Sequence, residues 1–210
     1  MNEKFLPAAK YRVFTPLFDI ICNILGLGEG YRKEIINVLH LKNKKFKVLD
    51  IGCGTGSLII DIKKKFPKLE VIGVDPDQNI LRMATNKVHK NHMQVRLVTA
   101  FAQKLPFHSN HFDVVVSSLV FHHVPSQYKQ QALNETHRVL KPSGIFLLSD
   151  FGRPKNKFPL GSWLAMLFEE GKENYQGLLP QMIRNAGFKE VKILREHRYG
   201  IQLIKAGKAK

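Results

Sequence analysis

Three glycines and two carboxylates near an apolar run have the types and spacing that could bind a nucleoside. The run VLDIGCGTG, residues 48–56, combines the apolar side chains of a buried strand with a glycine turn. Glycines let the backbone of such a turn lie flat against a ligand that a Cβ would push away. Asp75 ends the next apolar run, EVIGVD, where its carboxylate could accept hydrogen bonds from both ribose hydroxyls. The pattern predicts a nucleoside cofactor.

Glycine spacing helps to separate the two cofactor classes that use this geometry. A dinucleotide site is marked by G-x-G-x-x-G, with backbone amides at a helix N-terminus meeting a pyrophosphate. Here Gly52, Gly54 and Gly56 give G-x-G-x-G. Asp50, two residues before the first glycine, is unfavourable beside a pyrophosphate and suits the cationic amino-acid end of S-adenosylmethionine. The turn therefore favours S-adenosylmethionine.

Five stretches, in order along the chain, resemble the motifs of class I S-adenosylmethionine-dependent methyltransferases. They are VLDIGCGTG (48–56), GVDPDQNILRMA (73–84), AFAQKLPF (100–107), FDVVVSSLVFHHV (112–124) and ETHRVLKPSGIFLLSDF (135–151). Ordered matches are far more specific than a lone glycine turn. The resemblance is closest to the small-molecule branch that includes the ubiquinone and menaquinone C-methyltransferases. It implies an enzyme that transfers a methyl group from S-adenosylmethionine to a small or lipid-soluble acceptor by in-line displacement.

The resemblance also implies which residues contact the cofactor. An aromatic residue near the chain start closes over the cofactor in this family, and Tyr11 is the candidate. Phe101 stands where these enzymes commonly carry an aspartate that binds the adenine amino group, so adenine recognition is expected at the backbone of Ala102. Asp75 could also cap the following helix, although Asp77 is the better cap. The expected set is Tyr11, Asp50, Gly52, Cys53, Gly54, Gly56, Asp75, Pro76, Ala102, Gln103 and Ser117.

Two adjacent histidines are the candidates for acid–base chemistry. A sulfonium already carries an activated methyl group, so alignment is the main task and no catalytic side chain is strictly required. An acceptor that loses a proton would use a base, and His122 and His123 fall just beyond the fourth predicted strand. Imidazole titrates at about pH 6.5, which suits that role. Adjacent side chains do not readily aim at one point, so one is expected to act, and His123 is the candidate.

Alternating strand and helix patterns would bring these residues to one edge of a sheet. Strands are predicted at residues 47–51, 70–74, 94–99, 112–117, 144–149, 191–197 and 199–206. Helices are predicted from residue 57 and at residues 77–89, 127–140 and 178–186. Such alternation predicts a doubly wound, Rossmann-like α/β fold with a mainly parallel seven-stranded sheet, an antiparallel C-terminal strand and helices on both faces.

One methyltransferase domain is expected over residues 1–210, because this length and 44% hydrophobic content suit a single core. Residues 1–45 are expected to form a helical cap. Residues 151–177 mix Gly and Pro with large apolar side chains, and are interpreted as a lid insertion or, equally, as a helix packed on the core. Ser143 replaces a glycine of the usual Lys-Pro-Gly-Gly turn, which is interpreted as a tolerable variation. No metal is expected, since the histidines lack ligand spacing.

The cysteines and the net charge indicate which cellular compartment and which binding partners to expect. Cys53 lies inside the cofactor turn, where a disulfide with Cys22 would block the pocket, so a reducing cytoplasm is expected. No signal peptide or membrane span is expected. The net charge of +16 would suit a polyanion. The lysine runs at residues 42–47 and 63–68 are expected opposite the cofactor, so a solvated basic face is favoured, with loose contact to anionic lipid as a middle possibility.

Two other functions stay open at this stage. An RNA methyltransferase would use the positive charge, and its RNA binding would weaken steeply with salt. A regulatory or scaffold protein without turnover would keep the same glycine turn. The sequence specifies neither the acceptor atom nor the oligomeric state.

Overall fold

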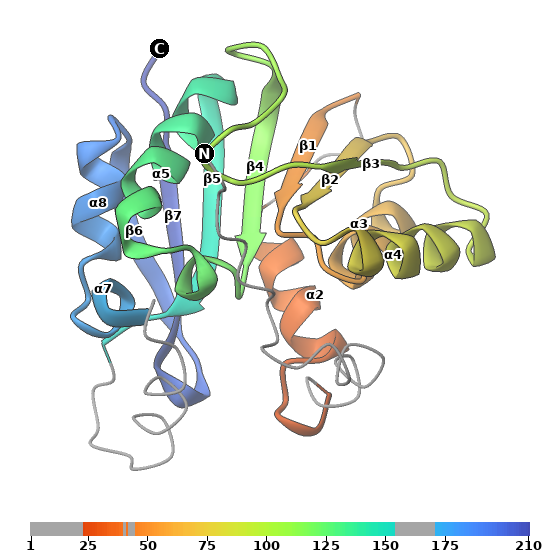
Figure 1. Ribbon diagram of the computed structural model, residues 1–210, viewed down its shortest axis with the longest axis horizontal. Helices are drawn as coiled ribbons and strands as arrows, with labels where there is room; N and C mark the ends of the chain where they lie inside the picture. Colours follow the sequence, from red (N-terminus) through yellow and green to blue (C-terminus); the bar gives the residue numbers. More distant parts are fainter. Residues whose placement is uncertain (1–22, 40, 42–44, 154–170) are drawn as a thin grey trace.

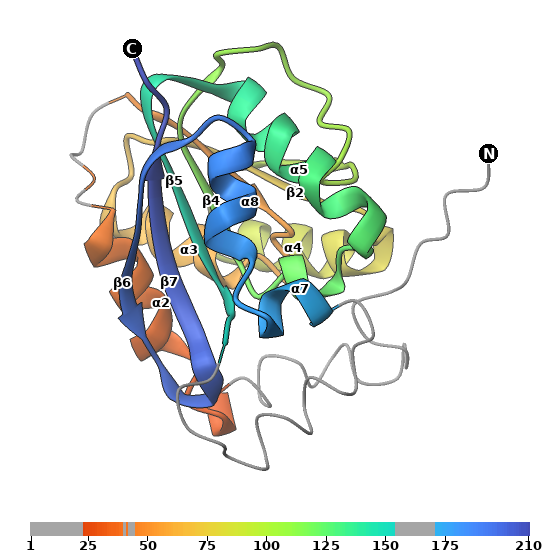
Figure 2. The ribbon, with the colours of Figure 1, turned by 90° about the vertical axis from the view of Figure 1, so that its left-hand side faces the viewer.

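A seven-stranded sheet with helices on both faces forms the protein (Figures 1 and 2). The computed structural model describes residues 23–39, 41, 45–153 and 171–210. The spatial strand order is β3-β2-β1-β4-β5-β7-β6. The first five of these strands pair in parallel, and β7 is antiparallel to both of its neighbours. The predicted fold class is therefore confirmed.

The strands lie where the sequence predicts them, with differences at their ends. They are β1 Lys47–Ile51, β2 Glu70–Asp75, β3 Arg96–Thr99, β4 Phe112–Ser118, β5 Leu140–Phe151, β6 Lys189–Glu196 and β7 Ile201–Gly207. The start of β5 at Leu140 is earlier than predicted, because Leu140 already pairs with Phe112 before a register shift.

The helices flank the strands in the expected order. They are α2 Glu29–Val38, α3 Ser57–Lys65, α4 Gln78–Lys90, α5 Ser126–Val139, α7 Lys172–Tyr175 and α8 Leu179–Asn185, with 3₁₀ turns η2 Phe121–His123 and η4 Arg198–Gly200. Asp77 is the N-cap of α4, since its side chain accepts hydrogen bonds from the amides of Asn79 and Ile80. Asp75 is thus left for another task.

Two apolar layers, one on each face of the sheet, hold the helices. In β1, Leu49 packs in the layer that includes residues of α5 and α8, and its neighbour Val48 packs in the layer that includes residues of α2, α3 and α4. Successive strand residues point to opposite faces, so a strand covered on both faces needs a continuous apolar run. This requirement explains why the central strands are so apolar.

Ser143 adopts a backbone conformation that usually belongs to glycine. Its φ is 60°, in the left-handed region, which costs a non-glycine residue about 1–2 kcal/mol. This turn position therefore does require a positive φ, which glycine adopts without strain. The serine that stands here in place of glycine is strained. The next residue, Gly144, would bring a Cβ within 2.7 Å of Leu140.

Several expectations concern residues outside the described part of the chain. Tyr11 lies in residues 1–22, and most of the expected lid lies in residues 154–170, so neither is described. Of the expected cap, α2 is described, and of the expected lid stretch, α7 is. Among the helices that are described, none has the length and apolar character needed to cross a membrane.

Candidate cofactor and catalytic site

The glycine turn follows β1 at the carboxyl edge of the parallel strands. Gly52, Gly54 and Gly56 have φ values of 70°, 53° and 77°, a region that suits glycine. A Cβ on Gly52 would come 2.3 Å from the Val120 side chain. A Cβ on Gly54 would meet no atom of the described residues within 4 Å. The turn is therefore closed on the side of Val120 and open at Gly54, where a flat ligand can lie.

Asp75 ends β2 and holds the glycine turn with its side chain. Its Oδ2 accepts a hydrogen bond from the Gly54 amide at 3.0 Å, and its Oδ1 accepts one from the Asp77 amide at 3.0 Å. Burial raises the pKa of Asp75 to about 6, and the two amides partly oppose this rise. Each carboxylate oxygen keeps a second lone pair, so the expected ribose contact stays compatible with these bonds.

Asp50 lies in β1, two residues before the turn, and is only 2% exposed. Burial raises the pKa of Asp50 to about 8, and the nearby Asp75 adds to the rise. Its Oδ2 has no hydrogen-bond partner among the described residues. A buried carboxyl oxygen without a donor costs free energy, which a cationic ligand group would recover. The site therefore fits the cationic end of S-adenosylmethionine.

Other predicted contact residues lie at the same edge. The amides of Gly52 and Cys53 both donate to the Val74 carbonyl oxygen, at 2.8 and 2.9 Å. Cys53 is buried, and burial raises the pKa of its thiol. Ser117, near the end of β4, is fully buried, and its hydroxyl donates to the Ile51 carbonyl oxygen at 2.9 Å. These bonds join the ends of β1, β2 and β4 beneath the turn.

The loop after β3, where adenine is expected, is held by a pair of charged residues on α5. Ala102 and Gln103 are both buried in this loop. Glu135 accepts a hydrogen bond from the Leu105 amide at 2.9 Å, and Arg138 donates to the Leu105 carbonyl oxygen at 3.0 Å. The two side chains also pair with each other at 2.6 Å. The sequence analysis did not predict a role for Glu135 or Arg138, although both lie in the ETHRVLKPSG part of the fifth motif.

Pro76, also in the expected set, is half-buried directly after β2.

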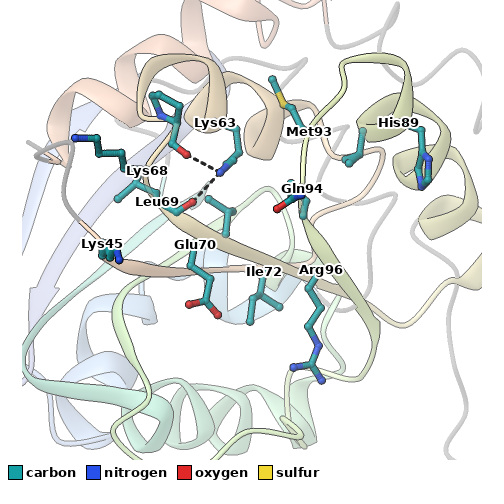
Figure 3. Close-up of a pocket in the computed structure, with 14 residues that line it drawn as sticks. Lys45, Lys63, Lys68, Leu69, Glu70, Ile72, His89, Met93, Gln94 and Arg96 are labelled. Carbon is teal, nitrogen blue, oxygen red and sulfur yellow. Dashed lines mark hydrogen bonds between the residues drawn. The ribbon is translucent and has the colours of Figure 1, made fainter.

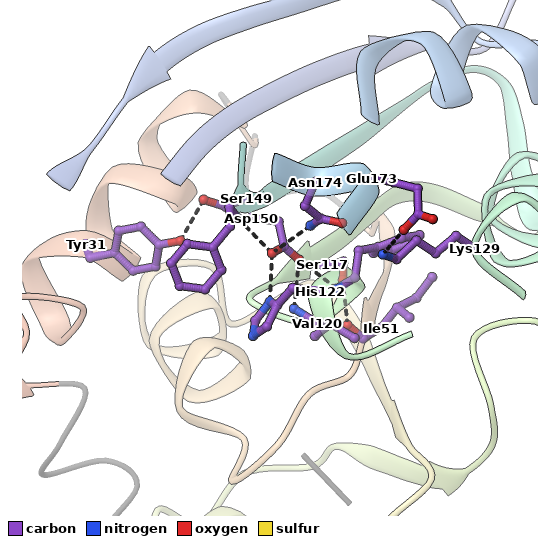
Figure 4. Close-up of polar contacts among 12 residues, drawn as sticks. Tyr31, Ile51, Ser117, Val120, His122, Lys129, Ser149, Asp150, Glu173 and Asn174 are labelled. Carbon is purple, nitrogen blue, oxygen red and sulfur yellow. Dashed lines mark hydrogen bonds and ion pairs between the residues drawn. The ribbon is translucent and has the colours of Figure 1, made fainter. Parts of the chain in front are cut away.

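A fully buried carboxylate, Asp150, lies near the end of β5 at the same edge (Figure 4). Its Oδ1 lies 2.7 Å from Nδ1 of His122, and Asn174 donates to the same oxygen at 3.3 Å. Its Oδ2 accepts from the amides of Val120 and Phe121, at 3.0 and 2.6 Å. Asp150 and Asn174 were not predicted. The polar Ser-Asp pair near the end of an apolar strand is the signal that could have pointed to Asp150.

His123, the predicted base, lies beside His122, with ring centroids 4.0 Å apart. Burial lowers the pKa of His123 to about 2, and the neighbouring His122 adds to this shift. The ring is therefore neutral near physiological pH and is a weak base. The catalytic role of His123 stays a prediction. The histidine that forms a hydrogen bond with a carboxylate is His122.

A basic groove lies at the opposite, amino-terminal edge of β2 and β3 (Figure 3). The basic and acidic side chains that line it are Lys45, Lys63, Lys68, Glu70, His89 and Arg96. The Lys63 ammonium donates to two backbone carbonyl oxygens, those of Pro67 and Leu69, at 2.8 and 2.9 Å. The groove thus lies away from the glycine turn. In the part of the chain that the structure describes, no cluster of three His, Cys, Asp or Glu residues could hold a metal ion.

The sheet is doubly wound, its glycine turn is open, and buried acidic residues lie at the ends of β1 and β2. These features define a protein that binds a nucleoside cofactor with a cationic group.

Comparisons with known proteins agree. A family described as a methyltransferase domain matches residues 48–144. A demethylmenaquinone methyltransferase of Lactobacillus johnsonii is 32% identical over 178 residues, 82% of this chain and 68% of that protein. Its counterpart from Staphylococcus carnosus is 31% identical over 201 residues, 84% of this chain and 82% of that protein.

Solved structures share the fold. Phosphoethanolamine N-methyltransferase 2 of Haemonchus contortus, in complex with S-adenosylmethionine, has a TM-score of 0.71 and 18% identity, covering 88% of this chain and 53% of that chain. An S-adenosylmethionine-dependent methyltransferase from Aquifex aeolicus has a TM-score of 0.67 and 20% identity, covering 84% and 88%. The chain belongs to the class I S-adenosylmethionine-dependent methyltransferases, in the branch that includes the demethylmenaquinone methyltransferases. It is an enzyme, and S-adenosylmethionine is its cofactor.

Proposed function

We propose that this enzyme transfers the methyl group to a ring carbon of a lipid-soluble hydroquinone, the reduced form of a quinone. The observation that carries the proposal is the identity of 31–32% to two demethylmenaquinone methyltransferases over more than four fifths of this chain. A relative named for ubiquinone and menaquinone biosynthesis, a C-methyltransferase of Syntrophotalea carbinolica, adds support at 29% identity over 167 residues.

The residues at the carboxyl edge divide the binding task. Asp50 would bind the cationic amino-acid end of the cofactor, and Asp75 would bind its ribose. The part of the cofactor between these two ends would lie against the open face at Gly54. The loop after β3 would take the adenine at the backbone of Ala102. S-adenosylmethionine, when bound, supplies an activated methyl group. Holding both reactants in this way can contribute effective molarities on the order of 10⁵ M.

Apolar side chains beside the glycine turn would help to exclude water from the reacting groups. Val120 packs against the turn, and the ring of Phe151 lies edge-on to His122. Water that reached the site would compete as an acceptor and weaken the electrostatic contacts. Displacement in line requires that the acceptor carbon approach the methyl carbon opposite the sulfur.

Methyl transfer to a short-chain demethylmenaquinol tests the acceptor. The purified enzyme is given S-adenosylmethionine with a ¹³C-labelled methyl group, and the product is analysed by mass and by NMR. We expect a methyl group bonded to a ring carbon. Labelled oxygen-methylated product, or transfer to phosphoethanolamine or RNA instead, would show that the acceptor is misassigned.

Chirally labelled methyl groups test the in-line course of the reaction. Direct displacement inverts the configuration of the methyl carbon, whereas transfer through an enzyme-bound methyl group inverts twice and retains it. We expect inversion. Retention would exclude direct displacement while leaving the acceptor assignment in place.

A further inference from the structure

We propose that His122, held by Asp150, takes the proton from the acceptor hydroxyl during methyl transfer. The proposal rests on the proposed function, because it needs an acceptor whose hydroxyl can ionise. Methylation at a ring carbon is faster from a phenolate than from a phenol, since the phenolate places electron density on that carbon. A base at the mouth of the site would therefore contribute directly to the rate.

The contacts of Asp150 determine which nitrogen of His122 carries hydrogen. Besides His122, the carboxylate accepts from the backbone amides of three nearby residues and from the side-chain amide of Asn174. All of these partners are N–H donors, so the carboxylate acts as an acceptor on every side. The Nδ1 of His122, 2.7 Å from Oδ1, must donate as well. The neutral ring therefore has its lone pair on Nε2, which is the atom that can receive a proton.

Burial makes this pairing effective. Asp150 is 0% exposed and His122 is 5% exposed. In such surroundings water does not compete for the hydrogen bond of 2.7 Å between the carboxylate and the ring, so the ring is held in one orientation. An aspartate performs this task for the histidine of the serine hydrolase triad, where it fixes the tautomer and steadies the charged ring.

The pair lies beside the cofactor turn. The Val120 side chain occupies the space next to Gly52, and His122 follows two residues later in η2. The Val120 amide is bonded to Asp150, so the short loop is fixed between the glycine turn and the end of β5 (Figure 4). The imidazole is therefore held at the edge where methyl transfer takes place.

A second layer of contacts supports Asp150 from α7. Asn174 is fully buried and donates to Asp150 at 3.3 Å. The preceding residue, Glu173, forms an ion pair of 2.8 Å with Lys129, which lies on α5 and is 0% exposed. This pair anchors α7 so that Asn174 reaches the carboxylate. Asp150 and Asn174 are thus positioning residues, and His122 is the residue that contacts the substrate.

The proton and electron changes balance without a further reactant. The hydroxyl O–H bond breaks, its proton moves to Nε2 of His122, and a phenolate results. An electron pair of the phenolate forms the new carbon–carbon bond as the methyl–sulfur bond breaks, and the electrons of that bond stay on sulfur. The methylated carbon then loses its hydrogen to water as a proton, and the imidazolium returns its proton to the oxygen. One proton is released for each methyl group transferred.

The tautomer of His122 can be measured without cofactor or acceptor. In protein labelled with ¹⁵N-histidine, long-range proton–nitrogen NMR spectra distinguish the two neutral tautomers. The signal of His122 is assigned by its loss in His122→Asn. We expect hydrogen on Nδ1, and hydrogen on Nε2 instead would overturn the proposal.

Paired substitutions test the catalytic role. We expect His122→Asn to lower kcat with demethylmenaquinol by about 10²–10⁴-fold, with unchanged calorimetric affinity for S-adenosylmethionine. His123→Asn is measured beside it, and His89→Asn, at an exposed histidine on α4, is the control that should keep the wild-type activity. Circular dichroism establishes that the three variants fold.

The two proposals fail in different ways. A wild-type enzyme that methylates no hydroquinone would refute the proposed function, and the role of His122 would fall with it. A wild-type enzyme that does so, together with an equally active His122→Asn, would refute only the role of His122. A loss confined to His123→Asn would assign the base to His123.

Discussion

Gly54 is the residue of the turn at which a side chain would meet the cofactor rather than the protein. Its φ is 53°, and a Cβ there would have no neighbour among the described residues within 4 Å. A substitution to alanine would therefore add only the strain of left-handed backbone, about 1–2 kcal/mol. The new methyl group would occupy the space that the ligand needs.

We expect Gly54→Ala to weaken S-adenosylmethionine binding by about tenfold or more, a loss of ~1.4 kcal/mol. Gly26→Ala is the matched control, because Gly26 also has a positive φ, 76°, and open space at its Cβ position. Urea unfolding should show similar destabilisation in both variants. Calorimetry should show a loss of affinity in Gly54→Ala alone, and an equal loss in both would place the cause in backbone strain.

Asp50 couples cofactor binding to pH. Because burial raises its pKa to about 8, the carboxyl of the free enzyme holds a proton near neutral pH. The stability that this raised pKa contributes is fully present below the unfolded pKa and is lost as pH rises through about 8. A cationic ligand favours the ionised carboxylate, so binding near neutral pH should release this proton.

We expect the affinity for S-adenosylmethionine to rise from about pH 6 to about pH 8, and to fall once the ligand amino group loses its own proton, near pKa ~8. Calorimetry in two buffers of different ionisation enthalpy measures the proton released. Asp50→Asn, which keeps the shape of the side chain, should abolish the release. Proton release that is the same in wild type and Asp50→Asn would remove Asp50 from this role.

At the scale of elements, an ion pair with α5 helps to hold the short helix α7 in place. Lys129 is 0% exposed, and its ammonium lies 2.8 Å from Glu173. Burial tends to raise the pKa of Glu173, but hydrogen bonds from Lys129 and Ser126 oppose it, and the net shift is downward. The carboxylate is therefore ionised at neutral pH and balances the buried ammonium.

Glu173→Ala removes the carboxylate from a buried cation, and we expect the free energy of unfolding to fall by about 3 kcal/mol. The double variant Lys129→Met/Glu173→Leu, which removes both charges, should recover much of that loss. Urea unfolding measures both effects. A single variant as stable as the wild type would show that the ion pair does not anchor α7.

The order of the elements could be predicted from the sequence because period and length of the apolar runs are local properties. The start of β5 could not, since the pairing of Leu140 with Phe112 is made by tertiary structure. The same limit applies to the site. Asp50, Gly54 and Asp75 lie in or just after one apolar run each, so they can be recognised from the local sequence. Asp150 receives hydrogen bonds from Val120 and Asn174, which are far from it in the chain.

Over the whole molecule, cofactor chemistry and positive charge lie at opposite edges of the sheet. The glycine turn follows the carboxyl end of β1. The basic groove lies at the amino-terminal ends of β2 and β3, strands that Figure 1 labels and Figure 3 shows in close-up. Lys68 and Arg96 are exposed in this groove. Lys189 and Lys192 are also exposed, but they lie on β6, at the other end of the sheet. The net charge of +16 can therefore attract anions without contributing to the site.

A matched pair of charge reversals separates the groove from net charge. We expect Lys68→Glu/Arg96→Glu to elute from a heparin column at lower salt than Lys189→Glu/Lys192→Glu, which changes the net charge equally, because clustered cations act on one polyanion segment. Both variants should keep the wild-type affinity for S-adenosylmethionine and the wild-type rate with demethylmenaquinol. Equal elution would mean that the charge acts diffusely. A loss of methyl transfer in the groove variant alone would make the groove part of the acceptor site, and would favour an anionic acceptor such as RNA over a hydroquinone.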